Sequence, residues 1–213
     1  MEIIGFCGRA GTGKNTAATI MSEILGNAGI SSAHISFAYP LKKIATEIFA
    51  IPEEFVFGDS KNRKIKIGCW EDYFDKTIPN NILKSDNISV RQFLTHLGGD
   101  VFRKMIDENF WVKSFKNRID KKSYDLVFKH DTDVKVVLVT DVRYQNEVEV
   151  IKAIGGRTIK LERISLKHAH ESEDCVDNIP EDMFYKVFDH EEISTLKDLK
   201  AKILTVLNDM ELI

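Results

Sequence analysis

The chain has 213 residues, of which 43% are hydrophobic and 30% are charged, and its formal net charge is −3 at pH 7. This composition is typical of a folded globular protein, and the small negative charge argues against a general nucleic-acid-binding surface. No apolar run approaches the roughly 18 residues of a membrane span and no targeting leader is recognisable, so we expect an untargeted cytoplasmic protein. The three cysteines are widely separated and form no CxxC pair, which indicates neither a disulfide framework nor a zinc site.

Residues 2–16, EIIGFCGRAGTGKNT, predict a strand, a glycine-rich loop and a helix that begins near Lys14. The backbone N–H groups of such a loop and the positive end of the helix together form a site for phosphate. Lys14 is expected to contact the β- and γ-phosphates of ATP, and the hydroxyl of Thr16 to serve Mg²⁺ directly or through water. The alternative is a glycine-rich turn with a surface lysine. The predicted phosphate-binding residues are Gly8, Gly11, Thr12, Gly13, Lys14, Asn15 and Thr16.

The next elements alternate between helix and strand. Apolar residues at helical spacing from Ala17 to Leu25 predict a helix, and residues 33–37 predict a second strand. Pro40 then opens a helix that runs to about Phe49. Residues 51–87 show no sustained period, so we interpret them as loop and short helix.

Two helices are expected after residue 88. Ser89 is suited to the N-cap of the first helix, whose apolar residues repeat on one face until Gly98 and Gly99 break it. A second helix follows directly. The residues expected to face inward from it are Val101, Phe102, Met105 and Ile106.

Three polar residues of the first of these helices lie along a side that could face a cleft. Arg91 offers a bidentate fork for a phosphate group. Gln92 or Thr95 could hydrogen-bond the edge of a base or a sugar. The alternative is a surface arginine on an amphipathic helix.

A second strong signal is VKVVLVTDVRYQNE. Residues 136–139 form a continuous apolar run, as expected for a parallel strand buried on both faces, and Asp141 follows at its C-terminal end. An acid in this position can hold Mg²⁺ through water, which is the role of a Walker B residue. Arg143 is a candidate phosphate clamp, and Glu147 could orient it or accept from a sugar hydroxyl. A structural salt bridge between Arg143 and Glu147 is the alternative.

The C-terminal third predicts three further regular elements. RTIKLER and FYKVFD are expected to be strands, and residues 196–207 a closing amphipathic helix. Between the two strands, the polar stretch 163–182 is predicted to be a lid that closes over the phosphates, with Arg157 or Arg163 reaching in. A metal site that uses the two histidines of KHAH is a weaker alternative, because no third ligand has a recognisable spacing.

Several stretches taken together resemble the phage deoxynucleoside monophosphate kinases, a family with an adenylate-kinase-like core. These stretches are GRAGTGKNT, SFAYPLKKIA, RQFLTHLGGDVFR with FWV, VTDVRYQNEVEVIKAIGGRTIKLER and HESE. The glycine-rich loop alone is unspecific. The combination of RQ, GG and W with DVRYQNE is much more specific.

This resemblance implies transfer of the γ-phosphoryl group of ATP to a deoxynucleoside 5′-monophosphate, with Mg²⁺, in DNA precursor synthesis. It also implies a phage origin, action in the host cytoplasm, small-molecule partners and a homodimer. Thr95 and Gly99 stand where relatives often have glutamine and threonine, so base selectivity does not transfer. Asn15 stands where relatives often have an acid, so the resemblance does not fix its role in metal or nucleotide binding. The implied catalytic residues are Lys14, Arg91, Asp141 and Arg143, with Thr16 and Asp141 at the metal. The implied acceptor-nucleotide residues are Arg91, Gln92, Thr95, Gly98, Gly99, Trp111, Arg143 and Glu147.

The expected architecture is the α/β fold of a P-loop NTPase, a five-stranded parallel sheet flanked by helices. Residues 1–40 and 134–213 would form the core domain, and 41–133 a mainly helical insertion that binds the acceptor. Two other functions stay open. One is a P-loop kinase of another small acceptor such as dephospho-coenzyme A, and the other is an ATP- or GTP-binding switch. A switch has no need for a long arginine-bearing insertion, which favours phosphoryl transfer.

Overall fold

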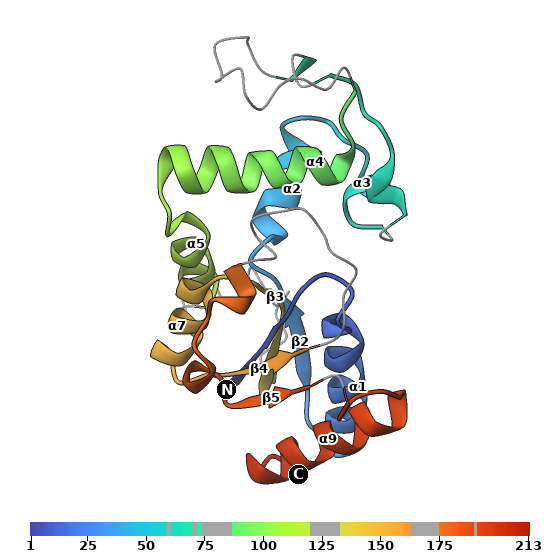
Figure 1. Cartoon of the computed structure of the whole chain (residues 1–213), viewed down its shortest axis with the longest axis vertical. Coiled ribbons are helices and arrows are strands. Elements are labelled where there is room, and N and C mark those ends of the chain that lie inside the picture. Colours follow the sequence, from blue (N-terminus) through green and yellow to red (C-terminus); the bar gives the residue numbers. More distant parts are fainter. Residues whose placement is uncertain (59–60, 70–71, 74–86, 120–132, 163–174, 190) are drawn as a thin grey trace. The chain divides into compact units, whose positions relative to one another are not determined.

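The computed structural model describes residues 1–58, 61–69, 72–73, 87–119, 133–162, 175–189 and 191–213 (Figure 1). The chain forms two compact units. The first joins Met1–Phe37 to Phe115–Ile213, and the second is Ala38–Ser114. The predicted insertion, 41–133, includes residues outside the described part of the chain, so its bounds stay a prediction.

The first unit is built on a five-stranded sheet whose neighbouring strands are all parallel, in the order β2-β3-β1-β4-β5. This confirms the predicted five-stranded parallel sheet. Buried apolar runs form its central strands, as expected for strands covered on both faces. The strands are β1 Glu2–Cys7, β2 Ser32–Ile35, β3 Val136–Val142, β4 Arg157–Leu161 and β5 Lys186–Phe188.

Alternate residues of β1 face different helices. Ile4 and Phe6 belong to the core formed with α1 Lys14–Asn27 and α9 Leu196–Asp209. These are the first and the last helix of the chain, and they contact each other (Figure 1). Gly5 faces the other side, where a Cβ atom would lie 2.8 Å from Cδ1 of Ile151 in α7 Gln145–Ala153. Helices therefore cover both faces of the sheet, which leaves the carboxyl ends of the strands as the edge for ligands.

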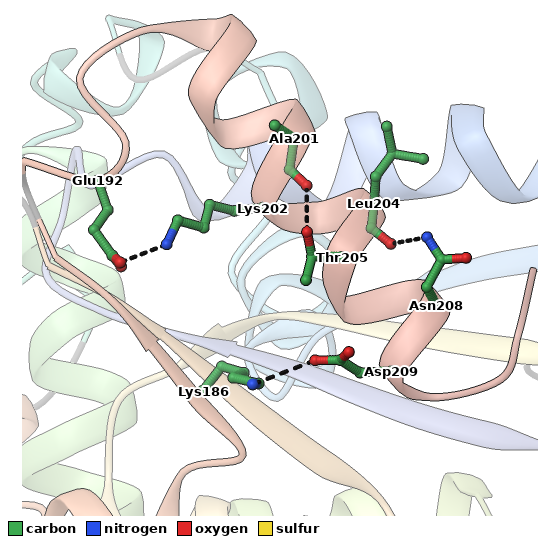
Figure 2. A network of polar contacts seen from close by, with 8 residues as sticks. All are labelled: Lys186, Glu192, Ala201, Lys202, Leu204, Thr205, Asn208 and Asp209. Atoms are coloured by element: carbon green, nitrogen blue, oxygen red, sulfur yellow. Dashed lines mark hydrogen bonds and ion pairs between the residues drawn. The ribbon is translucent and has the colours of Figure 1, made fainter.

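Helix α9 is also held by polar contacts (Figure 2). Lys202 pairs with Glu192, and Lys186 of β5 lies 3.3 Å from the carboxylate of Asp209. Leu199, Ile203 and Leu207 are buried, which confirms the predicted amphipathic closing helix. Among the described residues, no helix combines the length and the apolar character needed to cross a bilayer.

The second unit is mainly helical in its described part. Pro40 lies in the first turn of its first helix, which confirms the predicted start. In the C-terminal part of this unit, Ser89 forms a capping box at the N-terminus of a long helix. The elements are α2 Tyr39–Glu47, α3 Glu53–Val56, η1 Asn62–Lys64, α4 Val90–Thr95 and η3 His96–Ile106, and α5 Phe110–Ile119 begins in this unit.

The predicted helix break at Gly98 and Gly99 is wrong. Helix α4 continues without interruption into η3, which has π-helical hydrogen bonding, and neither glycine has a positive φ (Figure 1). Gly98 instead serves close packing, because a Cβ atom there would lie 2.6 Å from Cδ2 of Leu41. Since π-helical bonds span one residue more than α-helical ones, an α-helical spacing assigns the wrong face. Met105 and Ile106, predicted to face inward, are 59% and 58% exposed.

Candidate functional site

The glycine-rich loop connects β1 to α1 at the carboxyl edge of the sheet. Gly13, the N-cap residue of α1, has φ 97° in the left-handed region, a conformation that a side chain disfavours. Thr12 is buried, and both its N–H and its hydroxyl donate to the carbonyl of Arg9, at 3.4 and 2.9 Å. The loop is therefore a tight turn held by its own hydrogen bonds, and it lies at the N-terminus of a 14-residue helix.

Lys14 is buried in this loop rather than extended at the surface, which excludes the alternative of a surface lysine. Its ammonium donates to the carbonyls of Gly8, at 2.6 Å, and Arg9, at 2.7 Å. These bonds use two of the three donors of the group and hold its charge at the loop. Asn15 and Thr16 are exposed on the first turn of α1, and Gly8 and Gly11 complete the predicted set with positive φ values.

Asp141 lies near the end of β3, next to the loop. The pairing of β1 with β3 shifts between Gly5 and Cys7, so that β3 has an extra residue where Asp141 stands. Such a bulge re-aims side chains at the edge of a sheet. One carboxylate oxygen of Asp141 accepts from the backbone N–H of Phe37, two residues after β2, at 2.9 Å.

Glu147 is buried at the start of α7 and binds the main chain. Its Oε2 accepts from the N–H groups of Arg143, at 2.8 Å, and Tyr144, at 3.2 Å, and so closes a capping box. Glu147 thus contacts the main chain of Arg143, and this contact fixes the backbone from which Arg143 projects. A negative charge near the helix N-terminus also complements the helix dipole.

Cys7, the last residue of β1, has an unreactive thiol. Burial, together with the negative charge of Glu147, raises its pKa to about 12, although Lys14 and Lys160 act in the opposite direction. The thiol is therefore protonated at physiological pH and offers neither a nucleophile nor a metal ligand beside the phosphate loop.

In the second unit, the polar residues of α4 have different surroundings. Arg91 is exposed and Thr95 half-buried. The side-chain oxygen of Gln92 accepts from the N–H of Ser89 at 2.9 Å, and the Ser89 hydroxyl accepts from the Gln92 N–H at 3.2 Å. The pattern Ser-x-x-Gln in the sequence is typical of a capping box, so this role of Gln92 could have been predicted beside its proposed contact with the acceptor.

Trp111 is tied to the long helix. Its indole N–H donates to the carbonyl of Gly98 at 3.0 Å, its side chain is buried, and Phe102 and Phe110 surround it with ring centroids 4.8–5.0 Å away. Gly98 and Trp111 thus act together to fix η3 to α5, whereas Gly99 has open space where a Cβ atom would be. Their expected place in the acceptor region stays a prediction.

The two arginines predicted to reach in from a lid differ in outcome. Arg157 opens β4, pairs with Glu2 at 2.7 Å and lies over the ring of Tyr185, at the end of the sheet away from the loop, so its predicted role is wrong. The amino end of β4 lies at the opposite end of the strands from the loop, so Arg157 is too far away to close over a phosphate there. Arg163, His168 and His170 lie outside the described residues, as do residues 163–174 of the predicted lid, 163–182. In the described part of that range, Val176 and Ile179 are buried in the first unit, which does not fit a lid that opens and closes. The rest of the lid stays a prediction.

The fold and the loop define the class of this protein. A parallel sheet in the order β2-β3-β1-β4-β5, with a glycine-rich loop and a buried lysine between β1 and α1, is that of a P-loop kinase-type α/β protein. A family model described as deoxynucleotide monophosphate kinase matches residues 33–203, and the chain belongs to that family. The phosphate loop lies before the matched range, so the motif and the family match are independent observations.

Two viral relatives carry names of the same family. A protein of Acanthamoeba polyphaga mimivirus, provisionally named as a deoxynucleotide monophosphate kinase, is 29% identical over 178 residues, 81% of each chain. The deoxynucleoside-5′-monophosphate kinase of Escherichia phage T5 is 24% identical over 189 residues, covering 70% of this chain and 71% of its own. Among solved structures, shikimate kinase from Bacteroides thetaiotaomicron aligns with 99% of this chain and 98% of its own, at 12% identity and a TM-score of 0.45.

Proposed function

We propose that the protein transfers the γ-phosphoryl group of ATP to a deoxynucleoside 5′-monophosphate and releases ADP and the deoxynucleoside diphosphate. The family match over residues 33–203 carries this proposal. The phosphate loop with its buried Lys14 supports it from outside the matched range. The product would serve as a precursor for DNA synthesis.

On the donor side, the loop N–H groups and Lys14 would bind the β- and γ-phosphates and neutralise the charge that develops during transfer. Mg²⁺, when bound, would screen the same oxygens, and Thr16 and Asp141 supply the hydroxyl and carboxylate oxygens that this ion prefers. Asp141 already accepts one main-chain hydrogen bond, which holds its carboxylate in place. Gly8, Gly11, Thr12, Gly13 and Asn15 complete the proposed donor site.

On the acceptor side, we assign Arg91 and Arg143 to the phosphate groups, because a guanidinium matches phosphate oxygens in a bidentate way. Glu147 would keep the main chain of Arg143 in place through the hydrogen bond described above. No general base is required, since the attacking phosphate oxygen is already anionic. Gln92, Thr95, Gly98, Gly99 and Trp111 are proposed to shape the acceptor region.

The proposed partners are therefore ATP and a deoxynucleoside monophosphate, rather than nucleic acid or membrane. A cytoplasmic location, a homodimer, a helical acceptor domain over 41–133 and a lid in the part of 163–182 that precedes the buried Val176 belong to the same proposal. Each follows from the family resemblance and awaits its own measurement.

A coupled ADP-release assay tests the reaction. ATP and Mg²⁺ are supplied with each common deoxynucleoside monophosphate, each ribose counterpart and dephospho-coenzyme A. We expect ADP release to rise with one or more deoxynucleotides. Stimulation by dephospho-coenzyme A alone would assign a different acceptor, and release that no acceptor changes would contradict the kinase proposal.

A further inference from the structure

An arginine inside the phosphate loop is held by an aspartate 168 residues further along the chain. Nε of Arg9 donates to Oδ1 of Asp177 at 3.2 Å, and Nη2 donates to Oδ2 of the same carboxylate. Both residues belong to the first unit. Two parallel bonds between a guanidinium and a carboxylate fix orientation as well as distance, so this contact defines where the Arg9 side chain lies.

The residue held in this way also orders the loop. The backbone carbonyl of Arg9 accepts from the N–H and the hydroxyl of Thr12 and from the ammonium of Lys14. Three donors, including the lysine proposed to contact ATP, thus depend on the position of one carbonyl. Anchoring the side chain of Arg9 therefore limits the movement of its own carbonyl, which accepts these three hydrogen bonds.

The backbone around Asp177 is held in place by buried neighbours, so Asp177 can anchor Arg9. It lies on a helical turn, 175–177, between Val176 and Ile179, which are only 2% and 3% exposed. The carboxylate itself is about half exposed. The two apolar neighbours fix the segment in the core of the first unit, so that the carboxylate contacts Arg9 from a fixed position.

We propose that Asp177 is a positioning residue for the phosphate loop: it fixes Arg9 so that the loop and Lys14 are preorganised for the triphosphate of ATP. This inference rests on the proposed phosphate-binding function of the loop. An exposed ion pair contributes little to global stability, so its effect is expected in nucleotide affinity rather than in melting temperature. Preorganisation raises affinity because less order must be created on binding.

The charge of Asp177 makes the proposal easy to distinguish from simple electrostatics. A carboxylate beside the binding site of a polyanion repels it, so its removal should tighten ATP binding if charge alone matters. If Asp177 positions the loop, its removal should weaken ATP binding. The two accounts predict opposite signs for the same variant.

The experiment measures ATP binding by calorimetry and steady-state kinetics for Asp177→Asn, Arg9→Lys and the double variant. We expect each single variant to raise the Kd and KM for ATP about tenfold, well within the loss that a misplaced group can cause. The KM for the acceptor should stay unchanged. The double variant should be no worse than either single one, because both remove the same contact. Asp177→Glu should restore part of the affinity.

Asp209→Asn is the matched control. It removes the same charge from the exposed Lys186–Asp209 pair, which lies between the start of β5 and the end of α9 (Figure 2). We expect its ATP affinity to equal that of the wild type. If Asp177→Asn is destabilised, Arg9→Lys carries the test, since it keeps the charge and loses only the bidentate fork.

Tighter or unchanged ATP binding in Asp177→Asn and Arg9→Lys would overturn the positioning role. Strictly additive losses in the double variant would do so as well. These outcomes are distinct from failure of the proposed function, which would show as a wild-type protein that binds no ATP or whose ADP release ignores every acceptor.

Discussion

The phosphate loop and the long helix α4–η3 differ in how their residues are fixed. In the loop, short-range hydrogen bonds from side chains to the main chain set much of the geometry: Lys14 and Thr12 both donate to the carbonyl of Arg9, a few residues away. In the helix, contacts from other elements decide it, with Leu41 against Gly98 and Trp111 bonded to the Gly98 carbonyl. Local geometry can be inferred from a motif, whereas geometry imposed by packing cannot.

The largest effect is expected at the loop. Lys14→Ala should reduce turnover by about 100- to 1,000-fold or more, because it removes a preorganised charge at the transferring phosphate. Lys197→Ala, an exposed lysine on α9, is the control and should leave turnover unchanged. Steady-state ADP release measures both. Near-normal turnover in Lys14→Ala would show that the loop is not the donor site.

A smaller but selective effect is expected for Arg143→Ala. Turnover should fall about 100-fold while the Kd for ATP, measured by calorimetry, stays close to that of the wild type. The main-chain bond from residue 143 to Glu147 survives the substitution, so the backbone should keep its place. Lys152→Ala removes an exposed charge from the same helix as a control. An equal loss of ATP affinity would contradict the acceptor-side role of Arg143.

The two glycines of the long helix should respond differently to alanine. Gly99→Ala meets open space and should stabilise the protein by about 0.5–1 kcal/mol through helix propensity. Gly98→Ala places its Cβ atom against Leu41, so the packing cost of about 1–3 kcal/mol should offset or exceed that gain. Denaturant unfolding compares the two. Equal stabilities would show that the contact with Leu41 does not determine the helix path.

The capping box at Ser89 separates a structural from a binding role. Ser89→Ala and Gln92→Ala should each cost about 1 kcal/mol of stability, since both break the same cap. If Gln92 also binds the acceptor, only Gln92→Ala should raise the KM for the deoxynucleotide. Matching kinetics in the two variants would limit Gln92 to the cap.

Much of the first unit could be predicted from the sequence. Apolar runs such as 136–139 become strands because burial on both faces requires them, and the glycine pattern before Lys14 specifies a phosphate loop. The bulge beside Asp141 was not predicted, because strand register depends on the assembled sheet. The main-chain role of Glu147 is local, but it was not predicted from the sequence, because Tyr144 is an unusual N-cap residue.

The second unit was less predictable. Two adjacent glycines usually end a helix, but here Gly98 allows close packing and the helix continues with π-helical bonds, which exposes Met105 and Ile106. The contact of Arg9 with Asp177 could not be predicted from the sequence either, since no local pattern links residues so far apart. The roles of the proposed site residues need measurement because most depend on a bound nucleotide.

The most direct test of the account follows the transferred group itself. ATP labelled in its γ-phosphate is incubated with the protein, Mg²⁺ and each unlabelled deoxynucleoside monophosphate, and the products are separated by chromatography. The account predicts that the label appears in the terminal phosphate of a deoxynucleoside diphosphate. Label released only as inorganic phosphate, whichever acceptor is present, would contradict it.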